Sequence, residues 1–144
     1  MPPRLATFLK PDIDAGLVQV RDGPDRSVII VKGDGFFAPA SADVEDKVRP
    51  LLGRIRAALA GVPGRVLITG HTDSQPIRSA RFPSNWHLSQ ARADAVKALL
   101  APDVKPERMH AEGRADSEPV VGNATPAERA QNRRVEITLF VQPV

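Results

Sequence analysis

The chain has 144 residues, of which 42% are hydrophobic and 26% are charged, as is usual for one globular domain with its own core. It has no cysteine, which excludes disulfides and thiolate sites and fits a periplasmic or extracellular protein. The net charge of +3 is too small and too dispersed to indicate nucleic-acid binding. The sequence contains neither a membrane-spanning apolar stretch nor the apolar segment of a signal peptide, so we expect a soluble chain whose membrane anchor lies outside it.

The N-terminal part predicts an extension, residues 1–34, packed on a main domain of residues 35–144. Apolar residues at helical spacing favour a helix that Pro11 keeps short, and two apolar stretches favour strands joined by a hairpin turn. The elements expected here are a short helix around residues 5–13, strands at 17–20 and 27–32, and a loop at 33–39.

The main domain alternates predicted helices with predicted strands. Ser41 is a candidate cap for a helix that runs to about residue 60, with a kink or break at Pro50. Further elements are a buried strand at 65–70, a helix at 85–100, a strand at 108–112, a helix opened by Thr125 and Pro126, and a strand at 135–141. The order β-β-α-β-α-β-α-β predicts an α/β fold, a two-layer sandwich with helices packed on a mixed parallel/antiparallel sheet.

Arg92 is the unusual residue of the 85–100 helix, because it falls within the apolar stripe formed by Leu88, Val96 and their neighbours. A guanidinium on an apolar face needs an anion, since an unpaired buried charge is very costly. Asp73, at the end of the preceding strand, is one candidate partner, and a ligand carboxylate is the other.

Two interpretations of Asp73 and Arg92 follow. They form either a structural pair that closes the edge of the core, or an open clamp for a zwitterion. In the clamp, Asp73 takes an ammonium group and Arg92 takes a carboxylate through parallel hydrogen bonds. A free amino acid or a peptide end satisfies both.

Four motifs in order resemble the OmpA-like C-terminal domain, which binds peptidoglycan non-covalently. They are Thr69-Gly70-His71-Thr72-Asp73, Asn85-x-x-Leu88-Ser89-x-x-Arg92-Ala93, Glu112-Gly113 and Asn132-Arg133-Arg134-Val135-Glu136-Ile137. The resemblance extends roughly from Phe36 to Leu139.

The resemblance implies a binding role for particular residues. The residue matching Asp73 holds the side-chain ammonium of meso-diaminopimelate in the stem peptide, and the residue matching Arg92 holds its carboxylate. The positions that line or support the groove are Asn85, Thr72, Leu88, Arg133 and the loop aromatic Phe37. It also implies a protein without a cofactor that anchors a complex and breaks no bond.

The loop after Asp73, residues 74–83, is longer than in many members, and it either narrows the groove or adds contacts. It resembles the loops of the flagellar stator protein MotB and of extended TssL, a type VI secretion subunit. The segments 16–20 and 33–37 are more similar to TssL. The resemblance to TssL implies that the chain is the periplasmic part of a subunit anchored in the inner membrane. Its expected partners are peptidoglycan and other subunits of the secretion complex, and it could also form a homodimer. The alternatives are a MotB-type anchor and an assembly or dimerisation module with a closed groove.

Other classes of site find little support. His71 and Asp73 share one side of a strand end, but nothing recruits His87 or His110, so we expect no metal. The sequence shows no nucleophile with a base and no paired carboxylates, so we expect no enzyme.

The cluster Arg133-Arg134 is too small for nucleic acid. Strand alternation predicts that Arg133 faces the groove while Arg134 pairs at the surface. Trp86, beside Asn85, is interpreted as a packing anchor.

Overall fold

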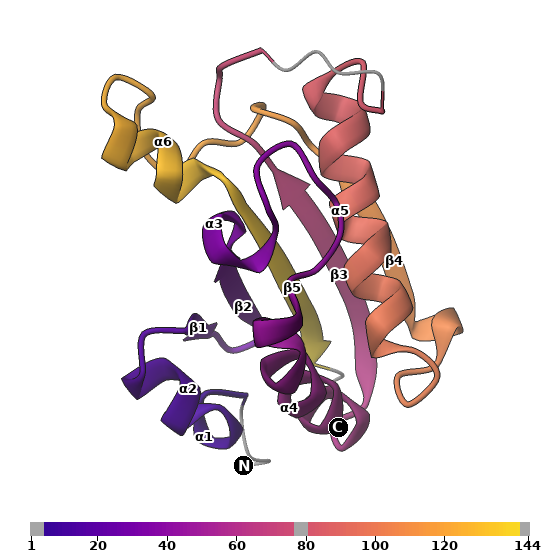
Figure 1. Ribbon diagram of the computed structural model, residues 1–144. Coiled ribbons are helices and arrows are strands. Elements are labelled where there is room, and N and C mark those ends of the chain that lie inside the picture. The colour runs from indigo at the N-terminus through magenta and orange to yellow at the C-terminus, as the bar shows by residue number, and fades with distance from the viewer. Residues whose placement is uncertain (1–4, 77–80, 142–144) are drawn as a thin grey trace.

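The protein is a two-layer α/β sandwich in which helices cover one face of a five-stranded sheet (Figure 1). The computed structural model describes residues 5–76 and 81–141. The strand order is β1-β2-β5-β3-β4; β3 and β4 are parallel, and the other neighbours are antiparallel. The strands are β1 (Val18–Asp22), β2 (Arg26–Lys32), β3 (Gly64–His71), β4 (Met109–Gly113) and β5 (Arg134–Val141). The predicted mixed sheet and element order are confirmed.

The two long helices, α4 and α5, provide the second layer. The helices are α1 (Leu5–Phe8), α2 (Lys10–Asp14), α3 (Gly33–Phe36), α4 (Arg49–Ala60), α5 (Asn85–Leu100) and α6 (Pro126–Asn132), with 3₁₀ turns η1 (Asp46–Val48) and η2 (Pro106–Arg108). Within the described ranges, no helix is long and apolar enough to cross a membrane.

The core lies between these helices and one face of the sheet. Val66 and Ile68 of β3 stand opposite Leu139 and Ile137 of β5, and all four are almost fully buried together with residues of α4 and α5. The intervening residues of each strand point to the opposite side. We call that side, which faces away from α4 and α5, the open face.

Two local predictions are wrong in part. The helix expected from Ser41 with a kink at Pro50 instead begins at Arg49, so Pro50 occupies its first turn, where a missing N–H costs nothing. The Ser41 hydroxyl accepts a hydrogen bond from the Asp43 amide (3.0 Å) within a loop. The loop expected at 33–39 contains the short α3, which Gly35 interrupts with a φ of +87°.

Helix α5 is confirmed at its predicted bounds, and it packs unusually close to the sheet. A Cβ at Gly70 would lie 2.2 Å from the Ser89 carbonyl oxygen, and one at Gly113 would lie 2.4 Å from the Gln90 nitrogen. The Gly113 amide also donates to the Gln90 side chain (2.9 Å). The two glycines therefore fix α5, which carries Arg92, against β3 and β4.

Residues 5–34 join the same structure. Val31 of β2 pairs with Val135 of β5, and buried Asp12 of α2 accepts a 2.6 Å hydrogen bond from Arg54 of α4. The division between residues 34 and 35 stays a prediction.

Candidate functional site

A cleft of about 460 Å³ opens at the C-terminal end of β3. The segment 34–40, the segment 72–76 and the start of α5 form its walls. All seven predicted site residues line it: Phe37, Thr72, Asp73, Asn85, Leu88, Arg92 and Arg133. Asp34, Gly35, Pro39, Ala40, Gln75 and Pro76 also line it, although none was predicted.

Asp73 is held in place on the floor of the cleft. Its side chain is 9% exposed; one oxygen accepts from Nη1 of Arg133 (2.5 Å), and the other accepts from the Gln75 amide (3.0 Å). The preceding Thr72 donates its amide to the Ala115 carbonyl (2.8 Å). Hydrogen bonds to both oxygens therefore fix the position of this carboxylate.

Arg133 lies between two carboxylates, those of Asp34 and Asp73. Its Nε and Nη2 donate to the two oxygens of Asp34 at 2.9 and 2.7 Å, while Nη1 donates to Asp73. Hydrogen bonds from Arg133 lower the pKa of Asp34, and those to Asp34 and Asp73 raise the pKa of Arg133. Asp34 therefore holds this guanidinium by a two-point contact.

Arg92 is buried, with 6% of its surface exposed, as the helical pattern predicted. Its Nε donates to the Ser41 carbonyl (2.8 Å), its Nη2 donates to the Ala38 carbonyl (3.2 Å), and the guanidinium stacks 4.8 Å from the centre of the Phe37 ring. Burial lowers its pKa to about 10, so the group is cationic at neutral pH.

The direct Asp73–Arg92 pair is therefore not formed. Backbone carbonyls orient Arg92, and Arg133 pairs with Asp73. In the part of the chain that the structure describes, Nη1 of Arg92 has no partner, and it is not a buried atom. This nitrogen is available to an anion in the cleft.

The long loop after Asp73 contributes to the cleft at its near end. The Gln75 carbonyl accepts from the Asn85 side chain (3.0 Å), which joins the loop to the first turn of α5. Beyond residues 77–80, which lie outside the described ranges, Phe82 is buried against Leu88, and Arg81 pairs with Asp43 at 3.3 Å. The described parts of the loop line the cleft without filling it.

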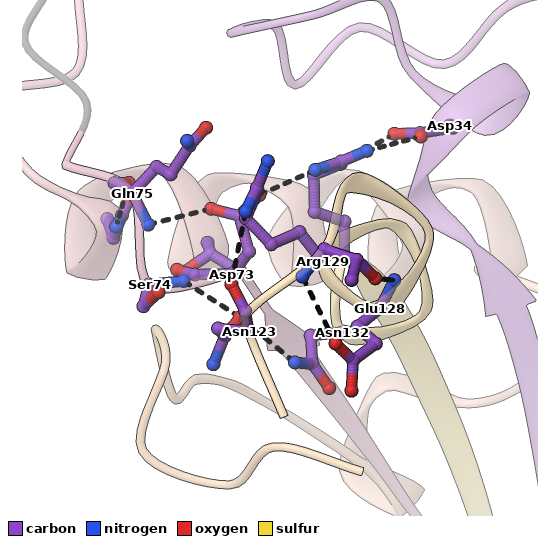
Figure 2. Close-up of polar contacts among 12 residues, drawn as sticks. Asp34, Asp73, Ser74, Gln75, Asn123, Glu128, Arg129 and Asn132 are labelled. Carbon is purple, nitrogen blue, oxygen red and sulfur yellow. Dashed lines mark hydrogen bonds and ion pairs between the residues drawn. The ribbon is translucent and has the colours of Figure 1, made fainter. Parts of the chain in front are cut away.

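Asn132, immediately before Arg133, positions that end of the cleft. It is fully buried, and its side chain bonds the amides of Val120 (2.8 Å) and Val121 (3.2 Å) and the side chain of Asn123 (3.0 Å). Asn123 in turn accepts from the Ser74 amide (3.2 Å; Figure 2). Asn132 is the first residue of the motif Asn132-Arg133-Arg134-Val135-Glu136-Ile137. That position could have indicated its structural role, but the sequence prediction did not include it.

Arg134 points to the open face and corrects a prediction. It was expected at the surface, but its side chain is 4% exposed. It donates to Glu136 (2.6 Å) and to the carbonyls of Asn132 (3.0 Å) and Glu118 (2.9 Å). The segment before α6 covers it, so the charge lies inside the fold.

His71 also belongs to this open-face cluster. Its Nε2 lies 2.9 Å from the Thr69 hydroxyl and 3.9 Å from the Glu136 carboxylate. Burial lowers the pKa of His71 to about 4. Among the described residues, no three His, Cys, Asp or Glu side chains converge as metal ligands do.

Trp86, expected as a packing anchor, is instead 55% exposed.

The protein is a small α/β domain whose cleft presents two carboxylates and two guanidiniums. Residues 36–133 match the sequence model of the OmpA family, and the chain belongs to that family.

Two solved structures resemble the whole chain. The cell wall anchor of the type VI secretion system (T6SS) from Pseudomonas aeruginosa is 55% identical, with a TM-score of 0.93 over 99% of this chain and 100% of that one. A MotB-like protein from Desulfovibrio vulgaris is 23% identical, with a TM-score of 0.87 over 94% and 88%, which shows the common fold.

Curated relatives are less similar in sequence than the secretion anchor is. YtxE of Bacillus subtilis is 35% identical over 140 residues (94% of this chain), and motility protein B of the same species is 36% identical over 116 residues (78%). The chain spans 57% and 44% of their lengths, about half of each.

Proposed function

We propose that this domain anchors a cell-envelope complex to peptidoglycan by holding the diaminopimelate of a stem peptide, without breaking a bond. The observation that carries the proposal is the cleft itself, where a fixed carboxylate, Asp73, and the available Nη1 of Arg92 line one space of about 460 Å³. The distal carbon of diaminopimelate carries an ammonium and a carboxylate, which need these two partners. Similarity over its full length to a T6SS cell wall anchor supports this function.

Ligand binding exchanges partners within the cleft. The ammonium takes the oxygen of Asp73 that now accepts from Nη1 of Arg133. Arg133 keeps its two hydrogen bonds to Asp34, so it remains in place with one donor released. The ligand carboxylate then binds Nη1 of Arg92. Two acids and two arginines make the cleft neutral, so a zwitterion adds no uncompensated buried charge.

The cleft also provides an apolar wall. Leu88 and the Phe37 ring line it beside the charged groups, and they suit the methylene chain of diaminopimelate. Thr72 and Asn85 complete the lining and offer hydrogen bonds to the peptide.

Two alternatives remain distinct from this proposal. An assembly module with a closed groove is less favoured, because the described residues leave a cleft of about 460 Å³. A MotB-type stator anchor would use the same ligand in another machine. The identity to the secretion anchor is 55%, against 36% to motility protein B, which favours a TssL-type subunit in the periplasm.

The full-length gene distinguishes a TssL-type subunit from a MotB-type anchor. A cytoplasmic helical domain before one membrane helix indicates TssL, and a membrane helix that carries an aspartate indicates MotB.

Co-sedimentation with purified sacculi tests the clamp. We expect the chain to pellet with diaminopimelate-type sacculi, and Asp73→Ala and Arg92→Ala each to weaken binding by about 10- to 100-fold, because each removes a charge-assisted contact worth about 1.5–3 kcal/mol. The matched controls are Asp46→Ala and Arg49→Ala, which remove an exposed surface pair.

Three outcomes of this experiment distinguish the diaminopimelate clamp from the other proposed functions. Unchanged sedimentation of both cleft variants defeats the clamp. No sedimentation of the unsubstituted chain favours the assembly module. Equal binding to lysine-type sacculi, whose lysine lacks the second carboxylate, retains cell wall binding but rejects diaminopimelate as the group held.

A further inference from the structure

A second hollow, of about 390 Å³, lies on the open face of the sheet beside β1. We call it the β1 hollow and define it by Leu17, Gln19, Arg21, Ile30, Lys32 and Val120. Gln19 and Ile30 are directly paired across β1 and β2, and they alternate with Val18 and Val31 of the core. The β1 hollow shares no lining residue with the cleft.

Two separate segments form walls of the β1 hollow, and each contributes an apolar side chain: Leu17, just before β1, and Val120, in the segment before α6. Leu17 is 46% exposed and Val120 is 44% exposed, and they are two of the four large exposed apolar residues in the described ranges. Ile30 of β2, 9% exposed, also lines the hollow. Two such side chains at one concave site are typical of an interaction surface.

Both walls are held by the fold. The Leu17 amide donates to the Asp12 carbonyl (2.9 Å), and the amides of Val120 and Val121 donate to the buried side chain of Asn132. The hollow is therefore preformed, which lowers the entropy lost on binding.

The charged residues that line the β1 hollow are all cations. Arg21 and Lys32 are exposed, and neither has an ion pair or a side-chain hydrogen bond with any residue in the described ranges 5–76 and 81–141. A third lining cation, Arg134, is already paired with Glu136. The lining contains no aspartate or glutamate.

We propose that the β1 hollow binds an acidic segment of a protein partner, which places an aliphatic side chain between Leu17 and Val120 and carboxylates at Arg21 and Lys32. A second copy is a poorer occupant, because this chain is itself basic, with a net charge of +3. A flat anionic membrane does not fit a concave site. Because the β1 hollow and the cleft share no lining residue, one domain can hold the cell wall and the partner at once.

Amide chemical-shift mapping by NMR tests the proposal with a defined probe. The probe is the acetylated and amidated peptide Glu-Leu-Glu-Leu-Glu, and the comparison peptides replace its glutamates with lysine or its leucines with serine. We expect shifts concentrated at Leu17, Gln19, Lys32 and Val120 with the probe alone. Raising the salt from about 50 to about 500 mM should weaken binding, because the attraction is partly between exposed charges.

Variants separate the contribution of the cations of the hollow from that of its apolar side chains. The double substitution Arg21→Glu with Lys32→Glu should weaken binding of the probe about tenfold or more, since like charges then face each other. Leu17→Ala with Val120→Ala should also weaken it and reduce the preference for leucine over serine. Lys105→Glu, an exposed cation outside the hollow, is the matched control and should bind as before.

Several results would overturn the proposal. Equal binding of the lysine peptide, shifts that map to the cleft, or no binding of the probe each reject an acidic partner segment. Self-association that the same substitutions abolish, measured by sedimentation velocity, replaces the partner with a second copy. Binding to phosphatidylglycerol vesicles without binding to the peptide replaces it with a membrane. Sacculus binding by the Arg21→Glu, Lys32→Glu protein should persist, so failure here leaves the cleft's function standing.

Discussion

Arg133 and Arg134 are neighbours in sequence but lie in two different kinds of environment. Arg134 points to the open face, where Glu136 and two carbonyls complete its hydrogen bonds and its side chain is 4% exposed. Arg133 points into the cleft, is 30% exposed, and is bonded to two cleft carboxylates. The fold supplies permanent partners to the first, whereas in the proposed function a ligand replaces one partner of the second. An ion pair is therefore informative about function when its partners line a space that another molecule can enter.

Replacing each arginine with alanine should separate the two environments most strongly. Arg134→Ala should lower the free energy of unfolding by about 3–5 kcal/mol, because it leaves Glu136 and two carbonyls without their buried partner. Arg133→Ala should cost only about 1–2 kcal/mol, since its partners line an open cleft. Urea denaturation measures both, and equal losses would contradict the comparison.

His71, which lies on the open face with Glu136 and Arg134, should also make stability depend on pH. The pKa of His71 is about 4 in the folded protein and about 6.5 in the unfolded chain, so the unfolded chain binds more protons between these values. Stability is therefore lost as pH falls from about 6.5 to about 4, by up to about 3 kcal/mol.

The matched variant is His71→Gln, in which the amide can replace Nε2 beside Thr69. Denaturation at several pH values should give a shallower loss for this variant over that window. A slope equal to that of the unsubstituted chain would show that His71 is not its source.

Asp34 tests the cleft side of the comparison. Asp34→Asn removes the anion that holds Arg133 by two hydrogen bonds, so Arg133 should pair more tightly with Asp73 and compete with the ligand ammonium. We expect sacculus binding to weaken about tenfold, or about 1.4 kcal/mol, with little change in unfolding. Asp34→Glu, which can restore the contact, should recover part of the affinity. Unchanged binding by Asp34→Asn would remove Asp34 from the mechanism.

The smallest effect is expected at an exposed ion pair outside the lining of the cleft. Arg81 and Asp43 form a pair whose side chains are 60% and 76% exposed, and exposed pairs contribute about 0–1 kcal/mol. Arg81→Ala should therefore change both unfolding and sacculus binding only slightly. A large loss of binding would show that the loop after Asp73 contributes directly to the site.

The sequence predicted those features that depend on local periodicity. The bounds of α5 and the burial of Arg92 follow from the spacing of apolar residues. The cap at Ser84 is a finding of the structure that the sequence prediction did not use. The start of α4 was missed, because Pro50 is compatible both with a kink and with a first turn, and only packing decides.

Partners distant in sequence could not be predicted in the same way. The guanidinium of Arg92 is oriented by carbonyls of Ala38 and Ser41, which every residue possesses and no pattern marks. Asp34 was missed because its contact with Arg133 joins opposite ends of the chain. Arg134 is buried only because the segment containing Glu118 folds over it, so strand alternation gave its direction but not its exposure.

The close approach of α5 to Gly70 and Gly113 has a consequence for sequence variation. Any side chain at either position would push against the backbone of Ser89 or Gln90 and displace the helix that carries Arg92. In a saturation-mutagenesis library selected for sacculus binding, both positions should tolerate almost nothing but glycine, although neither lines the cleft. Intolerance at these two positions would arise because a side chain there displaces α5. Positions sensitive to substitution would therefore include residues that do not contact the ligand.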